Sequence, residues 1–185
     1  MTRLTENSVL NTKNKSWSVT AEVVVPEQGA NGKGPMSRTI IAQGGAISGW
    51  SFYVKDGKAK FTYNNLLGLQ MFTTEAKELV PPGKHQVRSE FAYDGGGVAE
   101  GGDVSLYYDG EKVGKGRVEA TQPFAFSADE GIDIGRETGT TVAPDYGVQS
   151  SEFSGEIDRV ELKVGDDHSH MVDPEQLIHV LMTRN

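Results

Sequence analysis

The chain has 185 residues, of which 26 are acidic and 18 are basic, so its formal net charge is −8. Such a surface repels a phosphate backbone, and no stripe of lysines and arginines offsets it, so a nucleic-acid partner is not expected. The absence of cysteine excludes a thiol nucleophile, a disulfide framework and a cysteine-based zinc site. No apolar run approaches the roughly 20 residues that span a bilayer, so no membrane span is expected.

The length suits one domain rather than two. The 23 glycines are spread between short apolar runs, which is typical of many short strands joined by turns. We therefore expect one β domain over residues 1–170, followed by a short helix over residues 171–185. The compartment is not determined, although residues 1–6 lack the apolar stretch of a signal peptide, which favours a cytoplasmic location.

The first predicted strand covers residues 16–25, where polar and apolar residues alternate. One face of it is entirely apolar and consists of Trp17, Val19, Ala21, Val23 and Val25. Pro26 ends the strand, because proline cannot donate a hydrogen bond to a neighbouring strand. The short apolar run at residues 39–42 predicts a second, buried strand.

Two Asp-Gly pairs, Asp56-Gly57 and Asp109-Gly110, separate alternating runs. This dipeptide is a strong hairpin signal, because both central residues of a type I′ turn need positive φ. The hairpins that they predict join residues 50–55 to 58–63, and residues 103–108 to 111–118.

Further strands are predicted over residues 85–93, 124–126, 132–134 and 153–164. In the last of these, the apolar phase slips by one residue between Ile157 and Val160. A β-bulge near Asp158-Arg159 would allow both apolar residues to face the core. Helical signal appears only near the C-terminus, where an Asp-Pro pair precedes an amphipathic stretch.

Together these elements predict an all-β fold, an antiparallel two-sheet jelly-roll sandwich of about a dozen short strands with a short C-terminal helix. Strand parity gives the expected core, which consists of Trp17, Val19, Val23, Phe91, Leu106, Ile157 and Val160.

Aromatic residues on the predicted strands could form a platform for a sugar. The candidate binding residues are Trp50, Tyr53, Tyr63, Tyr107 and Arg136. Because neighbours on a strand point to opposite faces, one of Phe52 and Tyr53, and one of Tyr107 and Tyr108, should face outward. Packing in the core is the alternative role for these rings. A sulfated sugar would also need a cluster of cations, which the fold would have to assemble from Arg88, Arg117, Arg136 and Arg159.

An acidic group surrounds the predicted strand at residues 132–134. Asp129, Glu130 and Asp133 are candidate ligands for calcium, which prefers carboxylate oxygens on loops. A solvated acidic rim that also includes Glu137 is the alternative. No other cofactor is expected in this chain, since its four histidines are scattered.

Two stretches carry more apolar residues than one strand face can bury, so they are candidates for an interface or for self-association into a homo-oligomer. The candidate interface residues are Leu66, Leu67, Leu69, Met71 and Phe72 in the first stretch, and Leu177 and Leu181 in the predicted helix.

Residues 106–114 are similar to the L-Y-x-D-G-x-x-V-G hairpin of concanavalin A-like jelly-roll domains, and residues 153–160 resemble their F-x-G-x-I-D-x-V closing strand. A closer resemblance, from about Leu10 to Val164, is to the C-terminal domain of large bacterial arylsulfatases. The stretches that carry it are residues 10–17, 41–45, 49–51, 91–97, 121–123 and 126–130.

The resemblance implies that the chain is a non-catalytic fragment of an arylsulfatase, which hydrolyses sulfate esters with a formylglycine and a divalent metal. No Cys/Ser-x-Pro-x-Arg motif is present, so no catalytic residue can be carried over and the chain alone should not hydrolyse an aryl sulfate. The implied function is that of an accessory domain that packs in cis on the catalytic domain and shapes its cleft. The alternative is a carbohydrate-binding module for a glycan, sulfated or plain.

Overall fold

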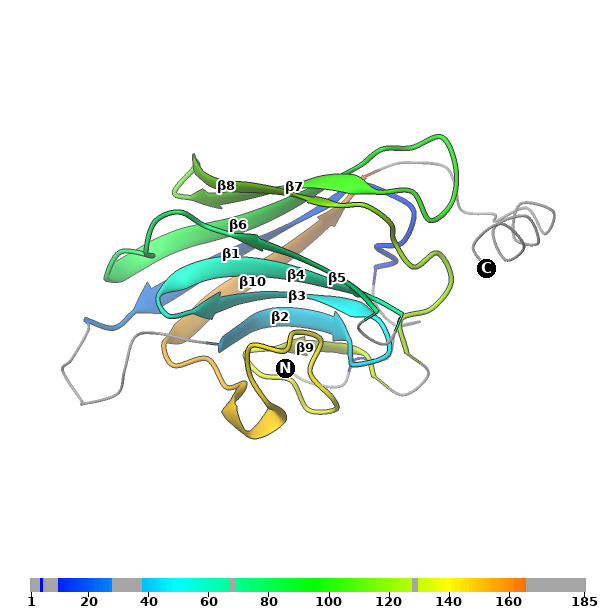
Figure 1. Ribbon diagram of the computed structural model, residues 1–185. Coiled ribbons are helices and arrows are strands. Elements are labelled where there is room, and N and C mark those ends of the chain that lie inside the picture. The colour runs from blue at the N-terminus through cyan, green and yellow to red at the C-terminus, as the bar shows by residue number, and fades with distance from the viewer. Residues whose placement is uncertain (1–3, 5–9, 28–37, 67–68, 128–129, 166–185) are drawn as a thin grey trace.

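The computed structural model describes residues 4, 10–27, 38–66, 69–127 and 130–165. In these residues, ten strands form two antiparallel sheets of five strands each (Figure 1). The predicted two-sheet sandwich is therefore confirmed, with ten strands in place of about twelve. The predicted helix over residues 171–185 lies outside the described residues. Within the described part of the chain, no helix has the length and hydropathy that a membrane crossing requires.

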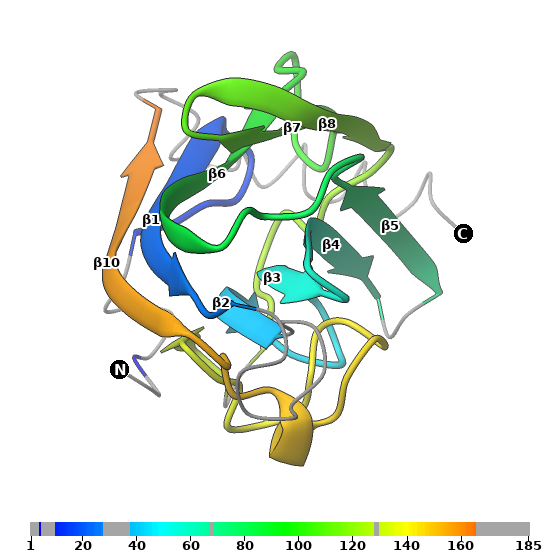
Figure 2. The ribbon, with the colours of Figure 1, turned by 90° about the vertical axis from the view of Figure 1, so that its left-hand side faces the viewer.

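We name the two sheets after β1 and β3, which are inner strands. The β1 sheet has the order β10-β1-β6-β7-β8, and the β3 sheet has the order β5-β4-β3-β2-β9. The two layers are separate in Figure 2. The strands of the β1 sheet are β10 (Glu156–Val164), β1 (Trp17–Val25), β6 (Gly83–Tyr93), β7 (Gly102–Tyr108) and β8 (Glu111–Val118). Those of the β3 sheet are β5 (Gln70–Glu75), β4 (Lys58–Asn65), β3 (Gly49–Lys55), β2 (Arg38–Gly44) and β9 (Ile132–Ile134).

The core lies between the sheets and follows the predicted parity. Every second residue of β1, from Trp17 to Val25, is buried. The Trp17 ring lies 4.3 Å from the Trp50 ring of the opposite sheet, measured between centroids. The prediction of a buried position is confirmed for Trp17, Val19, Val23, Phe91 and Leu106.

Both predicted hairpin turns form. Asp56 and Gly57 have φ angles of 52° and 80°, and Asp109 and Gly110 have φ angles of 47° and 88°. These four positive values are the signature of a type I′ turn. The two turns fix the registers of β3 with β4 and of β7 with β8.

The predicted bulge in β10 is also present. Val23 of β1 pairs with Ile157 and Glu22 pairs with Arg159, so Asp158 is left without a partner in β1. The expectation that Ile157 and Val160 are fully buried is wrong, since both pack against the core only partly buried. The reason is that β10 is an edge strand of the β1 sheet and is covered from one side only.

This difference in burial gives a testable stability series. Leu106→Ala removes a side chain with no solvent exposure and should lower the free energy of unfolding by about 2–5 kcal/mol. Ile157→Ala should cost less, because part of its surface already contacts water. Urea denaturation followed by circular dichroism measures both losses, and a larger loss for Ile157→Ala would contradict the observed packing.

Two regions differ from the sequence prediction. The apolar stretch after residue 63 continues β4 to Asn65 and then forms β5, which pairs with β4. Residues 124–126 form no strand. There, Phe126 alone is buried, and its ring packs edge-on against Tyr63 with a centroid distance of 6.1 Å. The buried ring of Phe126 therefore anchors this segment, which runs across one end of the sandwich.

Residues 135–151 form a long connection that follows β9 and leads towards β10. We call this segment the strap. It lies on the outer face of the β3 sheet next to β9 and β2, and it is the yellow segment in Figure 1. The backbone N–H of Thr39 donates to the carbonyl oxygen of Ser151 at 3.1 Å, which fixes the strap to the start of β2. The strap therefore covers a sheet face that would otherwise contact water.

Candidate functional site

Three of the predicted sugar-platform residues cannot serve as a platform, because Trp50, Tyr53 and Tyr63 are buried. Trp50 and Tyr63 are cross-strand partners on β3 and β4, and both rings face the core, where Trp50 packs on Trp17 and Tyr63 on Phe91. The alternative of core packing is therefore correct for Trp50 and Tyr63.

Tyr53 faces away from the core, yet the strap covers it. Its hydroxyl donates to the Asp145 carboxylate at 2.8 Å, and its ring packs edge-on against Tyr146. The prediction that one of Phe52 and Tyr53 faces outward is therefore confirmed for Tyr53, but the ring does not reach solvent, because the sequence does not reveal that the strap lies over this strand. Burial is also the main cause that raises the pKa of Tyr53.

A buried carboxylate, Glu137, anchors the strap. One carboxylate oxygen accepts hydrogen bonds from the hydroxyls of Tyr146 and Thr39, and the other accepts from the backbone N–H of Val142 at 2.8 Å. Burial raises the pKa of Glu137, although these hydrogen bonds oppose it. The sequence analysis placed this residue on a solvated rim, and it is instead a structural anchor with 3% of its surface exposed.

The predicted calcium ligands also contact the strap. Glu130 accepts a hydrogen bond from the Thr140 hydroxyl at 2.6 Å, and Asp133 accepts one from the Thr138 hydroxyl at 2.8 Å. Asp129 lies outside the described residues. Among those that are described, no three ligating side chains gather as a metal site would require. Calcium binding here stays a prediction, with no arrangement of ligands to support it.

The outer face of the β1 sheet carries a groove that the sequence analysis did not identify. Small side chains form its floor, those of Ser18 and Thr20 on β1 and that of Ser16 just before it. Longer side chains form its walls, Arg88 and Glu90 on β6 and Glu161 and Lys163 on β10. Thr20 pairs with Arg88 on one side and Glu161 on the other, and Ser18 pairs with Glu90 and Lys163. We call these seven residues the β1 groove.

The groove is hollow because short residues lie between long ones. A depression of about 410 Å³ occupies its end. Ser16, Ser18, Arg88, Glu90 and Lys163 supply its polar groups, and most of its lining is apolar, from these side chains and from Trp17, Phe91, Ala92, Val164 and Gly165. Hydroxyl groups on the floor can both donate and accept hydrogen bonds, carboxylates accept them, and the cations donate them. Such a surface can bind a ligand that is rich in hydroxyl groups.

Tyr107 lies beside this groove on β7. As expected for neighbours on a strand, Tyr107 faces outward and Tyr108 is buried. The Tyr107 hydroxyl donates to the Glu90 carboxylate at 2.7 Å. Its ring centroid lies 5.8 Å from the Arg88 guanidinium carbon and 5.4 Å from the Lys112 amine nitrogen. Among the predicted aromatic residues, Tyr107 is thus held next to the Arg88 and Glu90 wall of the groove with its ring partly exposed.

The arginines that a sulfated sugar would need do not come together. Arg88, Arg117 and Arg159 lie on β6, β8 and β10, and Arg136 follows β9 in the other sheet. The first three are each paired with acidic residues, Arg88 with Glu90, Arg117 with Asp94 and Asp103, and Arg159 with Glu161. The expectation that folding could gather them is therefore wrong.

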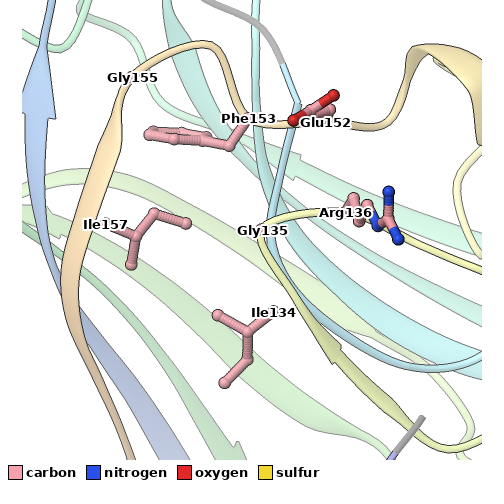
Figure 3. A pocket seen from close by; sticks show the side chains of 7 residues that line it. All are labelled: Ile134, Gly135, Arg136, Glu152, Phe153, Gly155 and Ile157. Carbon is pink, nitrogen blue, oxygen red and sulfur yellow. The ribbon is translucent and has the colours of Figure 1, made fainter. Parts of the chain in front are cut away.

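Arg136 borders a second depression, of about 450 Å³, between the edge strands β9 and β10 (Figure 3). The side chains of Ile134, Phe153 and Ile157 extend into it, whereas Arg136 and Glu152 lie away from them on one side. The lining of this depression combines these apolar side chains with the polar groups of Arg136, Glu152 and the backbone. It brings Arg136 near none of the other predicted binding residues.

His85 makes two polar contacts at the start of β6. Its Nδ1 lies 2.7 Å from an Asp109 carboxylate oxygen and its Nε2 lies 3.1 Å from the Pro82 carbonyl oxygen. The hydrogen bond with Asp109 is the main cause that raises the His85 pKa above 6.5, and burial opposes it only in part. Both ring nitrogens are occupied, so this residue ties two turns together.

The raised pKa predicts a pH dependence. Protonated His85 favours the folded state, so its contribution to stability is present below the ordinary histidine pKa of about 6.5 and is lost as the pH rises through the higher folded-state value. Titration of the His85 ring protons by NMR should give a pKa above 6.5. Asp109→Asn should return that pKa towards the ordinary value, and an unchanged pKa would contradict the role of this carboxylate.

Exposed apolar residues gather at the end of the sandwich where β3 begins and β4 ends. Hydrogen bonds from Asn64 to Ala46 and from Asn65 to Ala120 hold three loops together at this end. These loops and the nearby N-terminal segment expose Leu10, Ile47, Leu66, Leu69 and Phe124, which we call the end patch.

The prediction that part of the stretch at residues 66–72 is exposed is confirmed for Leu66 and Leu69, whereas Met71 and Phe72 are half-buried. Leu67, Leu177 and Leu181 lie outside the described residues.

Comparison with solved structures shows where this fold occurs. A mouse laminin α1 chain, domains LG4-5, superposes with a TM-score of 0.53 and 17% identity over 85% of this chain. The chain spans 39% of the length of that laminin chain. The CBM40 module of the Ruminococcus gnavus IT-sialidase, solved with bound α2,3-sialyllactose, superposes with a TM-score of 0.52 and 12% identity, covering 91% of this chain and 84% of that one. At this identity the likeness shows the jelly-roll fold alone. No protein-family model matches the sequence, and no curated protein matches it either.

Proposed function

We propose that this protein is a carbohydrate-binding module and that the β1 groove is its glycan site. The observation that carries the proposal is the groove itself, a hollow with a hydroxyl floor and walls of alternating charge beside the partly exposed ring of Tyr107. Sugars bind through convergent polar groups and an aromatic surface. The fold supports the proposal by analogy, since a structural neighbour is a sialidase module that holds a sialylated sugar.

A glycan array probed with the full chain tests this proposal. Ser18→Tyr would place a large ring on the groove floor between Glu90 and Lys163, and it should abolish the glycan signal of the unmodified protein. Ser154→Tyr, at an exposed position before β10 and outside the groove, is the control and should leave the signal unchanged. The proposal fails if no glycan is retained, or if both variants bind as the unmodified protein does.

We propose, as a second candidate function, that the protein is an accessory domain of an arylsulfatase and that the end patch docks on the catalytic domain. Two observations support it, the resemblance of residues 10–164 to such domains and the exposure of Leu66 and Leu69, at 52% and 78%, on one end of the sandwich. Large exposed apolar groups of this kind mark contact surfaces.

Calorimetric titration of the full chain with an isolated arylsulfatase catalytic domain tests the second candidate. Binding should be seen, and Leu69→Asp should weaken it, because a charge would be buried in an apolar contact. Leu79→Asp is the control, since Leu79 is also exposed but lies in the connection between β5 and β6, outside the end patch. The absence of heat with the unmodified chain, or equal binding by Leu69→Asp, would remove this candidate.

A further inference from the structure

The charges on the walls of the β1 groove neutralise each other. Arg88 pairs with Glu90 on β6, and Lys163 pairs with Glu161 on β10 with a nitrogen–oxygen distance of 3.2 Å. Each wall therefore contains one cation and one anion, and the four wall residues have no net charge.

The charges also alternate across the floor. Arg88 and Glu161 both pair with Thr20 from opposite sides, and Glu90 and Lys163 both pair with Ser18. A ligand lying on Ser18 and Thr20 therefore meets a carboxylate and a cation at each step along the strand. Two strand spacings separate the walls, roughly 9.5 Å between backbones, and this width suits a single chain that runs along β1.

We infer that the β1 groove binds an uncharged glycan chain, extended along β1, and discriminates against sulfated and carboxylated sugars. The inference deepens the proposed function and rests on it. A sugar hydroxyl donates to a carboxylate and accepts from a cation. One carboxylate and one cation on each wall therefore suit a chain of neutral hydroxyl groups.

An anionic sugar is disfavoured by the carboxylates on the groove walls. Its charge would lie close to Glu90 or Glu161, and like charges repel most strongly where solvent is displaced. To bind the anion, Arg88 or Lys163 would have to leave the carboxylate with which it is already paired. The carboxylate left behind would keep only its weaker partner, the Tyr107 hydroxyl for Glu90 or Arg159 for Glu161.

The test compares neutral, carboxylated and sulfated oligosaccharides of equal length on one array, probed with the full chain at two salt concentrations. The expected result is retention of neutral chains with little dependence on salt, because few ions are released when an uncharged ligand binds. Preferential retention of the sulfated or carboxylated chains would overturn the inference but would leave the proposed glycan function standing. If no class is retained, both fail.

A charge variant sharpens this test. The double variant Glu90→Gln/Glu161→Gln frees Arg88 and Lys163 from their carboxylate partners. It should lose the binding of neutral chains. It should retain sulfated chains about tenfold better, because the freed cations can make charge-assisted hydrogen bonds to sulfate. Glu27→Gln/Glu152→Gln makes the same change in net charge at exposed positions outside the groove and is the control. Equal gains by the two double variants would show that net charge, and not the groove, determines the retention of sulfated chains. That result would overturn the inference.

Discussion

Replacing Trp50 with alanine should reduce the free energy of unfolding by about 3–5 kcal/mol, the usual range for a large buried aromatic ring. Trp50 has no solvent exposure, and its ring packs on Trp17 and on Phe61 of the neighbouring strand. Its indole N–H also donates to the Thr12 hydroxyl and to the Gln43 side-chain oxygen, at 3.2 and 3.1 Å. The substitution therefore leaves a cavity and removes one hydrogen-bond donor, although the Thr12 hydroxyl still donates to the Gln43 oxygen at 2.9 Å. Because domains of this size are stable by only about 5–15 kcal/mol, the variant should be close to unfolding at body temperature.

Chemical denaturation followed by far-ultraviolet circular dichroism measures this loss. Trp50→Phe is the matched control, since it keeps an aromatic ring in the core and removes only the indole N–H. It should cost less than half as much as alanine. A loss below about 1 kcal/mol for Trp50→Ala, which is typical of a surface position, would contradict the central place of this ring in the core.

The second large effect is expected at Glu137. Glu137→Ala removes the acceptor for the Tyr146 hydroxyl, the Val142 N–H and the Thr39 hydroxyl, all on or beneath the strap. Each buried donor left without a partner costs about 1–3 kcal/mol. Because the Tyr146 hydroxyl keeps its contact with Ser51 at 2.7 Å, a total loss of at least about 2 kcal/mol is expected. Hydrogen exchange should show the strap opening while β1 and β6 stay protected, because the core packing of the sandwich does not include Glu137.

Glu137→Gln is the informative control. The amide oxygen can accept from the Val142 N–H, and the hydroxyls of Thr39 and Tyr146 can rotate to accept from the amide group. This variant should therefore keep most of the stability and the protection of the strap. If Glu137→Ala left the exchange of residues 136–151 unchanged, the carboxylate would not be the anchor that its contacts indicate.

The parts of the fold that the sequence predicts well are those encoded by neighbouring residues. Alternation over residues 17–25 identifies the buried face of β1, the Asp-Gly pairs locate both type I′ turns, and the phase slip between Ile157 and Val160 locates the bulge. In each case the signal is local, because side-chain direction and turn geometry depend on residues a few positions apart.

The parts that escape prediction depend on contacts across long sequence separations. Tyr53 is buried because Asp145 and Tyr146, more than 90 positions away, lie over it. Glu137 looks like any other acidic residue in a polar segment until the strap folds back on β2 and β3. The β1 groove has the same origin, because its floor and walls come from three strands that are distant in the chain. Only Tyr107 could have been identified in advance, from the rule that neighbours on a strand face opposite sides.

The bulge in β10 bears on the behaviour of the protein at high concentration. A nine-residue edge strand offers a row of unpaired backbone groups that could recruit a strand from another molecule and start aggregation. Here the extra residue Asp158 interrupts that row. The outward positions Glu156, Arg159, Glu161 and Lys163 also place a charge beside almost every potential pairing site. Deleting Asp158 would remove the bulge and leave a regular edge strand. The protein should then lose colloidal stability even if the rest of the sandwich stays folded.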